Sequence, residues 1–232
     1  EITTRLVGSE MCIRDSYTCG DLFLQPALLA AAEEALAELV RSTAEFNTAF
    51  AVGMPVAVDD MLYNCAVVAA AGEVLGVVPK RHIPAYAEFY ESRWFASGAE
   101  RPTVEIELCG QSVPFGTDLL FDIDGARCGV EICEDLWVPT PPSSELATAG
   151  AEVIFNLSAS PETVGKSDYV RQLVAQQSAR TRAAYVYCSA GFGESSTDLV
   201  FAGNALLAEN GTVLAAAERF SLDEQLLSLI HI

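Results

Sequence analysis

The chain has 232 residues, of which 51% are hydrophobic, and a formal net charge of −19 at pH 7. This charge argues against nucleic acid as a partner, because phosphate binding needs clustered lysines and arginines. Seven cysteines without a C-x-x-C pair, and only two histidines, favour neither a disulfide framework nor a zinc site and predict a reducing, cytoplasmic location. No apolar run reaches the roughly 18 residues of a membrane span, so no membrane partner is expected.

In chain order, the hydrophobic pattern first predicts a helix and several strands. Residues 25–46 have the periodicity of an amphipathic helix. A buried strand follows in "AFAVGMPVAV", and residues 64–80 predict two strands that turn at Ala71-Gly72. The next segment, "RHIPAYAEFYESRWF", is irregular and aromatic.

The second half of the chain continues the alternation of helices and strands. A predicted hairpin turns at Asp124-Gly125, and its second strand ends at Cys133. "SELATAGAEVIFNLSAS" predicts a helix, a strand and a loop, and "DYVRQLVAQQSARTRAAYVYCSA" a helix and a strand. A last hairpin turns at Asn210-Gly211. This alternation predicts one domain of the α/β class, with sheets covered by helices.

Two side chains at predicted strand ends could carry chemistry. Cys133 follows "CGVEI" and enters a turn, where a thiol can face a pocket, although cysteine is also among the most buried residue types. Lys80 follows "EVLGVVP" and could be a solvated strand end, or a cation that favours a nearby thiolate and stabilises an oxyanion. "AGFGES" lacks the third glycine of a dinucleotide-binding loop, so no bound nucleotide is expected.

Five segments together resemble one family: "VLGVVPKRHIPAYAEFYESRWF", "FGTDLLF", "VEICEDLWVPTPPS", "NLSASP" and "AAYVYCSAGFGESSTDLVFAGNALLAENG". They are similar to the glutaminase domains of glutamine-dependent NAD synthetases, which belong to the nitrilase (carbon–nitrogen hydrolase) superfamily. The resemblance extends from about Tyr17 to about Phe220. It implies an α/β fold of the nitrilase-like α-β-β-α sandwich type.

The resemblance also implies roles for individual residues. Cys133 of "ICED" matches the nucleophile, Lys80 the catalytic lysine, and Glu91 of "EFYE" a glutamate that orients the lysine and the substrate. The backbone N–H of Glu134 would join Lys80 in stabilising the oxyanion. The remaining matches lie around the bound glutamine, with Tyr86 and Phe89 in the loop and Ser160 and Lys166 at the amino-acid end of the substrate.

The implied reaction is hydrolysis of the glutamine side-chain amide through a cysteine thioester, with release of ammonia. The glutaminase domain needs no cofactor of its own. In the family, ATP and deamido-NAD bind a C-terminal synthetase domain, which is expected to be absent from this sequence, and the full enzyme is expected to be a homo-oligomer. Two alternatives remain: a stand-alone amidase of the same superfamily, and a catalytically inactive domain that only mediates assembly.

The two ends of the chain lead to a separate prediction. In the family, a segment like "PEL-x-L-x-GY" carries the general-base glutamate, and aligning its tyrosine with Tyr17 puts the base at Met11. "LVGSEMCIRDS" can be encoded by DNA that contains the reverse complement of a coding sequence for "LSLIHI". This shared DNA sequence resembles a transposon end that is used to build sequencing libraries. We therefore predict that residues 1–16 and 227–232 are translated adapter in a metagenomic fragment. Residues 17–226 would then be a partial domain without its first strand and its base.

On this interpretation, the chain should hydrolyse glutamine very slowly, because removing one member of a coupled catalytic set costs several orders of magnitude in rate. Replacing residues 1–16 by a native-like strand that ends in "PELxLxG" should restore hydrolysis, measured as ammonia release. A normal rate in the unchanged chain that Glu10→Gln abolishes would identify Glu10 as the base and refute the adapter interpretation.

Overall fold

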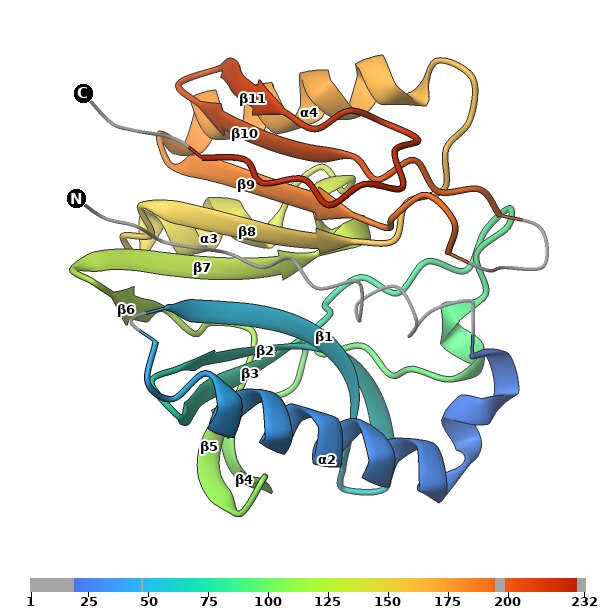
Figure 1. Cartoon of the computed structure of the whole chain (residues 1–232), viewed down its shortest axis with the longest axis vertical. Coiled ribbons are helices and arrows are strands. Elements are labelled where there is room, and N and C mark those ends of the chain that lie inside the picture. Colours follow the sequence, from blue (N-terminus) through green and yellow to red (C-terminus); the bar gives the residue numbers. More distant parts are fainter. Residues whose placement is uncertain (1–18, 47, 195–198, 229–232) are drawn as a thin grey trace. The chain divides into compact units, whose positions relative to one another are not determined.

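The computed structural model describes residues 19–46, 48–194 and 199–228 (Figure 1). The chain divides into two compact units, Glu1–Leu119 and Leu120–Ile232. Within the described ranges, no helix combines the length and the apolar character needed to cross a membrane. The predicted adapter segment 1–16, and residues 229–232 of the second one, lie outside the described residues.

The first unit is built on a five-stranded mixed sheet with the spatial order β1-β2-β3-β5-β4. The strands are β1 (Ala49–Val58), β2 (Met61–Ala70), β3 (Glu73–Pro79), β4 (Val104–Leu108) and β5 (Gln111–Phe115). β3 and β5 are parallel, whereas the other neighbours are antiparallel. The hairpin predicted at Ala71-Gly72 is confirmed, because both residues have the positive φ of a tight turn, 49° and 85°.

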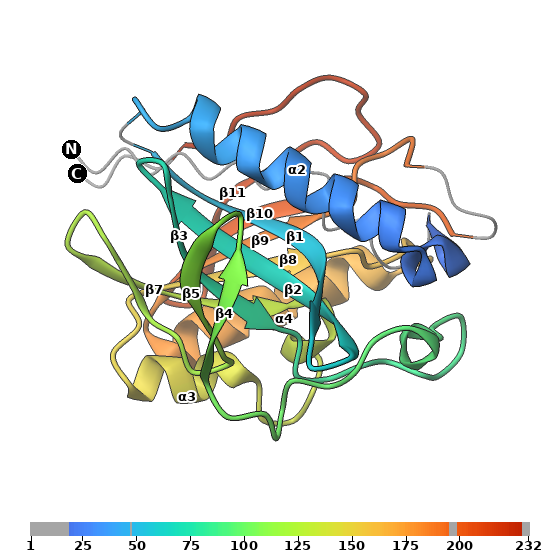
Figure 2. The ribbon, with the colours of Figure 1, turned by 90° about the horizontal axis from the view of Figure 1, so that it is seen from below.

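The predicted first helix is α2 (Pro26–Ser42), which follows the short 3-10 helix η2 (Gly20–Leu24). It ends at Ser42, earlier than predicted, and Thr43 caps it: the Thr43 hydroxyl donates to the Leu39 carbonyl at 2.7 Å and satisfies a carbonyl of the last turn. Leu36 and Val40, one helical turn apart, bury against the sheet residues of the same unit. Figure 2 shows α2 crossing β1 on this face.

The aromatic segment between β3 and β4 is irregular, as predicted, but it is firmly anchored. It contains one turn of 3-10 helix, η3 (Glu91–Arg93). Asp21 of η2 accepts hydrogen bonds from Arg93 at 2.6 and 2.8 Å and from the indole of Trp94 at 2.9 Å. The Phe23 ring packs on Trp94 and Phe95, with centroids 5.6 and 5.0 Å away. These contacts hold the loop against η2.

The second unit is built on a six-stranded sheet with the order β11-β10-β9-β8-β7-β6. The strands are β6 (Phe121–Ile123), β7 (Ala126–Ile132), β8 (Val153–Ser158), β9 (Ala184–Ser189), β10 (Ala205–Glu209) and β11 (Thr212–Ala216). The three strands β7, β8 and β9 are parallel; the single antiparallel strand β6 flanks β7, and the antiparallel hairpin of β10 and β11 flanks β9. The predicted turns at Asp124-Gly125 and Asn210-Gly211 are confirmed, since all four residues have positive φ.

Two helices connect the parallel strands. α3 (Pro142–Thr148) lies between β7 and β8, and α4 (Lys166–Thr181) lies between β8 and β9. Because β7, β8 and β9 are adjacent and in sequence order, right-handed crossovers place both helices on one face of the sheet. Leu146 of α3 and Val174 of α4 pack with Ile154 and Tyr185 of the strands. Figure 1 shows both helices behind the strands of this sheet. The predicted α/β class is thus confirmed in this unit, while the prediction that both units form one domain stays a prediction.

Candidate functional site

Lys80 directly follows β3, and its backbone is fixed on both sides. Its N–H donates to the Asn64 carbonyl of β2 at 2.8 Å, and its carbonyl accepts from the Gly98 N–H at 2.9 Å. The Lys80 side chain is only 1% exposed. Lysine is almost never fully buried unless it is paired, so this residue is not a solvated strand end.

The partner of Lys80 is Glu91. The Lys80 ammonium donates to both carboxylate oxygens of Glu91, at 2.9 and 2.7 Å, and the Glu91 side chain is 2% exposed. Glu91 begins η3, and its backbone carbonyl accepts from the N–H groups of Trp94 and Phe95 at 3.0 and 2.9 Å. The desolvation of two ions makes a buried pair weak support for stability. Its presence fits the chemical role that the sequence assigned to both residues.

The two aromatic residues predicted beside the substrate lie together in the same loop. The rings of Tyr86 and Phe89 meet edge to face, with centroids 5.4 Å apart. The Phe89 N–H donates to the Tyr86 carbonyl at 2.8 Å, which closes a tight turn. Tyr86 is 54% exposed, so the pair presents an aromatic surface to solvent.

The buried pair predicts a large effect of a small change. Glu91→Gln removes the Glu91 charge from the buried pair with Lys80, and should lower the free energy of unfolding by about 3–5 kcal/mol. Glu38→Gln is the matched control, because Glu38 pairs with Arg41 at a site where their side chains are 71% and 67% exposed. It should change stability by less than about 1 kcal/mol. Urea denaturation measures both, and equal effects would contradict the interpretation.

Cys133 lies where β7 ends and the 3-10 helix η4 (Cys133–Leu136) begins, and its φ is 47°. Asp124 and Asn210 also have positive φ, but each stands in a hairpin turn that requires it. Cys133 instead follows a buried parallel strand and is 7% exposed. Holding a non-glycine residue there costs roughly 1–3 kcal/mol. The Asp135 carboxylate accepts from the Ile132 N–H at 3.0 Å and clamps this turn.

Cys133 stands at the carboxyl edge of the parallel strands, where sheets of this kind bind ligands. β8 ends at Ser158 and β9 at Ser189, and these two residues are paired in register. Ser160 lies just beyond β8, and its N–H donates to the Ser189 hydroxyl at 3.4 Å. Parallel strands end on the same side, so the topology brings the predicted residues Cys133 and Ser160 to one edge.

The other predicted residues of this unit also lie near the turn. Glu134 is the second residue of η4, and its carbonyl accepts from the Trp137 N–H at 2.9 Å. Lys166 is the first residue of α4, and its ammonium lies 5.3 Å from the centroid of the Trp137 ring. Tyr169, one turn along α4, packs on the same ring at 5.4 Å. This contact places Lys166 beside the residue that follows η4.

The predicted residues therefore divide between the two units. Lys80, Glu91, Tyr86 and Phe89 belong to the first unit, and Cys133, Glu134, Ser160 and Lys166 to the second. The structure brings Lys80 together with Glu91, and it brings Cys133 and Ser160 to one edge of one sheet. Their catalytic and binding roles stay predictions.

A group of buried polar side chains beneath the helices was missed by the sequence analysis. They are Glu131 of β7, Asn156 of β8, Tyr185 and Tyr187 of β9, Ser143 of α3 and Gln177 of α4. The Tyr185 hydroxyl and the Ser143 N–H both donate to the Glu131 carboxylate, the second at 2.8 Å. Gln177 donates to the Ser143 hydroxyl at 2.9 Å. The sequence signal was a glutamate inside the apolar strand "CGVEI", which we had assigned no role.

Glu131 titrates in an unusual range for a carboxyl group. Burial raises its pKa to about 7; the hydrogen bond from Tyr185 lowers the pKa, the charge of Asp135 raises it, and the hydrogen bonds from Ser143 lower it. The strand β7, which ends just before Cys133, therefore carries at Glu131 a carboxyl group that is partly protonated near neutral pH.

Glu131 predicts a specific pH dependence of stability. Because its pKa in the folded chain is about 7 against a usual value of 4.5, its stabilising contribution is complete below pH 4.5 and is lost as the pH rises through 7. Glu131→Gln removes this loss, so the variant should gain stability relative to the unchanged chain across that range. Chemical denaturation at several pH values measures the difference. Glu224→Gln, at an exposed position of the same unit, should leave the pH dependence unchanged. A Glu131→Gln difference that is constant with pH would contradict the assignment.

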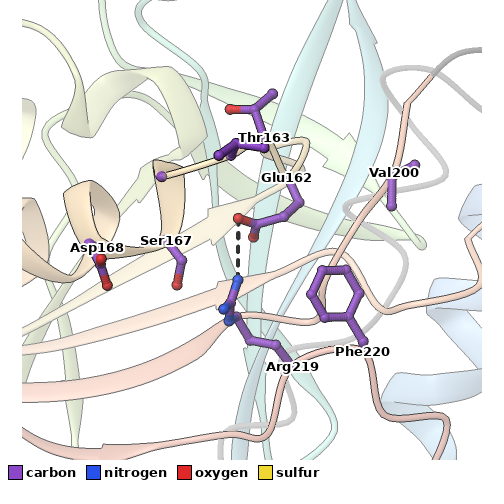
Figure 3. Close-up of a pocket in the computed structure, with 9 residues that line it drawn as sticks. Glu162, Thr163, Ser167, Asp168, Val200, Arg219 and Phe220 are labelled. Atoms are coloured by element: carbon purple, nitrogen blue, oxygen red, sulfur yellow. Dashed lines mark ion pairs between the residues drawn. The ribbon is translucent and has the colours of Figure 1, made fainter.

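A pocket of about 510 Å³ opens near the start of α4 (Figure 3). It is lined by Glu162, Thr163, Val164, Gly165, Ser167, Asp168, Val200, Arg219 and Phe220. Arg219, the cation among these lining residues, already pairs with Glu162 at 3.3 Å, and Asn204 donates to Glu162 at 3.1 Å. None of the predicted site residues lines this pocket, so it carries no assignment.

The sequence matches the carbon-nitrogen hydrolase family over residues 8–229. It is 50% identical over 208 residues to the glutamine-dependent NAD(+) synthetase of Mycobacterium tuberculosis. The aligned residues cover 88% of this chain and 30% of that protein. The human glutamine-dependent NAD(+) synthetase is 30% identical over 224 residues, which cover 93% of this chain and 31% of the human protein. The chain thus spans about 30% of the length of these curated relatives.

Solved structures show the same similarity. A glutamine-dependent NAD(+) synthetase from Cytophaga hutchinsonii superposes with a TM-score of 0.80 at 29% identity, covering 90% of this chain and 33% of that one. A carbon-nitrogen hydrolase from Helicobacter pylori superposes with a TM-score of 0.69 at 18% identity, and the match covers 90% of this chain and 70% of the hydrolase chain. At this identity, the similarity shows the fold alone. The predicted fold class, a nitrilase-like α-β-β-α sandwich, is confirmed. The predicted loss of the first strand concerns residues outside the described ranges.

Proposed function

Because this chain belongs to the carbon-nitrogen hydrolase family, we propose that it carries the glutamine-hydrolysing half-reaction of a glutamine-dependent NAD synthetase. The observation that carries the proposal is the cysteine of "ICED", held at positive φ at the carboxyl edge of the parallel strands. In the parent enzyme, a separate ATP-dependent domain would use the ammonia to amidate deamido-NAD in the cytoplasm. The half-reaction itself would use glutamine and no cofactor.

In the proposed reaction, the Cys133 thiolate attacks the side-chain amide carbon of glutamine. The C–N bond breaks, ammonia leaves with a proton from the general acid, and a glutamyl thioester remains on the sulfur. Water then attacks the thioester carbon, the C–S bond breaks, and glutamate is released as the thiol regains its proton. The family's glutamate would carry these protons; the position that matches it is Met11, outside the described residues, so we expect this chain to hydrolyse glutamine very slowly.

Lys80 and the backbone N–H of Glu134 would stabilise the negative charge that forms on the carbonyl oxygen. Preorganised donors of this kind contribute roughly 10²–10³-fold to kcat. Glu91 supports this role of Lys80, because it accepts from the ammonium with both oxygens and keeps it charged and oriented. The glutamine substrate would contact Tyr86, Phe89, Ser160 and Lys166.

Two other functions fit the observations less well. A stand-alone amidase shares the fold, but the relatives with 50% and 30% identity are both glutamine-dependent NAD(+) synthetases. A catalytically inactive assembly domain has no need for a strained cysteine at Cys133, since glycine adopts positive φ without that strain. It also has no need for the costly burial of Lys80 with Glu91.

A glutamine analogue with an electrophilic side chain should label Cys133 ahead of the other described cysteines. Burial raises the pKa of Cys128 and of Cys188 to about 11, so both remain almost entirely protonated thiols at neutral pH. Peptide mass spectrometry after brief labelling of the chain measures the order of reaction. This test needs only the nucleophile and the glutamine pocket, and so does not depend on the position of the general base.

Two controls accompany the labelling experiment. Cys128→Ala should leave the labelling of Cys133 unchanged, and preferential labelling of Cys128 or Cys188 would overturn the assignment. In the parent enzyme, Cys133→Ala should abolish glutamine hydrolysis and leave ammonia-driven NAD synthesis largely intact. Loss of both activities together would argue against a separate glutaminase site.

A further inference from the structure

Tyr187 of β9 has a buried hydroxyl that the reaction described above does not use. The residue is 1% exposed, and among the described residues its hydroxyl oxygen has no partner at hydrogen-bonding geometry. An unsatisfied buried polar group costs about 1–3 kcal/mol. A side chain of this kind therefore needs an explanation other than stability.

The strand register places Tyr187 just inside the carboxyl edge. Tyr187 is paired with Asn156, and two residues further along, Ser189 is paired with Ser158 at the ends of β9 and β8. On the other side of β8, Leu157 is paired with Ile132, the residue before Cys133. Tyr187 and Ser189 are two residues apart on one strand, so their side chains share the helix-covered face of the sheet.

Cys133, Ser158 and Ser189 lie two residues beyond the row that contains Tyr187, at the carboxyl edge of the three parallel strands. Burial and the charge of Cys133 raise the pKa of Tyr187, whereas the nearby hydroxyls of Ser158, Ser189 and Ser160 lower it. Ser158 donates its proton to the Asn156 side-chain oxygen at 2.7 Å, so it does not donate to Tyr187. Because the Tyr187 hydroxyl has no acceptor at hydrogen-bonding geometry among the described residues, its proton is available to the charge that forms at Cys133.

We propose that Tyr187 is a positioning residue for the nucleophile, whose hydroxyl donates a hydrogen bond toward the Cys133 sulfur when the thiolate forms. A donor to a charged acceptor makes a stronger hydrogen bond than a neutral pair, and it favours the charged form. The inference rests on the proposed function for the identity of the nucleophile.

Tyr185 is a matched control on the same strand. It lies two residues before Tyr187 on the same face, it is 0% exposed, and its hydroxyl donates to Glu131. Tyr185→Phe and Tyr187→Phe each remove one buried oxygen from one strand. The hydrogen bond from Tyr185 lowers the pKa of Glu131, so Tyr185→Phe should leave less negative charge on Glu131. Less negative charge near Cys133 should leave the titration midpoint of Cys133 unchanged or lower it.

The test is the alkylation rate of Cys133 by iodoacetamide as a function of pH, followed on the Cys133 peptide of the full chain. Tyr187→Phe should raise the midpoint by about one pH unit, which makes alkylation roughly tenfold slower below both midpoints. A purely structural role would change the rate by the same factor at every pH. An unchanged midpoint, or an equal rise in Tyr185→Phe, would overturn the proposal.

A second measurement needs no substitution at Tyr187. In the unsubstituted chain labelled with ¹³Cζ-tyrosine, the Tyr187 signal should shift with the same midpoint as the alkylation of Cys133, and Cys133→Ala should remove that titration. A Tyr187 signal that does not respond, or that still responds in Cys133→Ala, would refute the hydrogen bond. The proposed function fails instead on glutamine hydrolysis by Cys133→Ala in the parent enzyme, so the two failures are distinguishable.

Discussion

The parallel register of β7, β8 and β9 is the constraint on which the chemistry of the second unit depends. Each strand ends on the same side, so Cys133, Ser158 and Ser189 reach one edge although 25 to 56 residues separate them along the chain. The helices α3 and α4, which connect these strands, pack on one face of the sheet. The edge is therefore both the site of the proposed nucleophile and the rim of a buried polar layer.

Both units bury ionisable side chains, and each compensates the free-energy cost of removing these groups from water in a different way. The first unit pairs Lys80 with Glu91, so that two opposite charges neutralise each other inside the fold. The second gives Glu131 two neutral donors, Tyr185 and the Ser143 N–H, and burial raises the pKa of Glu131 to about 7. A paired carboxylate can hold a neighbouring cation in place, whereas a neutral-donor site can exchange its proton near physiological pH.

The parts of the fold that depend on local chemistry were predictable. The turns at Ala71-Gly72 and Asn210-Gly211 were found because a two-residue hairpin needs positive φ, which small or amide residues adjacent to glycine supply. The helix α2 was found by its periodicity, but its end was placed too late, because only the three-dimensional structure shows Thr43 capping the last turn. The role of Glu131 was missed, because its donors Ser143 and Tyr185 are 12 and 54 residues away along the chain.

The sequence by itself determined the family, the fold class and the identity of the candidate residues, since the "ICED" and "EFYE" segments are contiguous and need no folding to be compared. Only the tertiary structure decided which of these side chains are buried and what each one contacts. Lys80 could equally have been a solvated strand end until its ammonium was found on Glu91. The sequence does not single out Tyr187, because whether a buried hydroxyl has a hydrogen-bond partner depends on its surroundings. The surroundings of Tyr187 come from three separate strands, β7, β8 and β9.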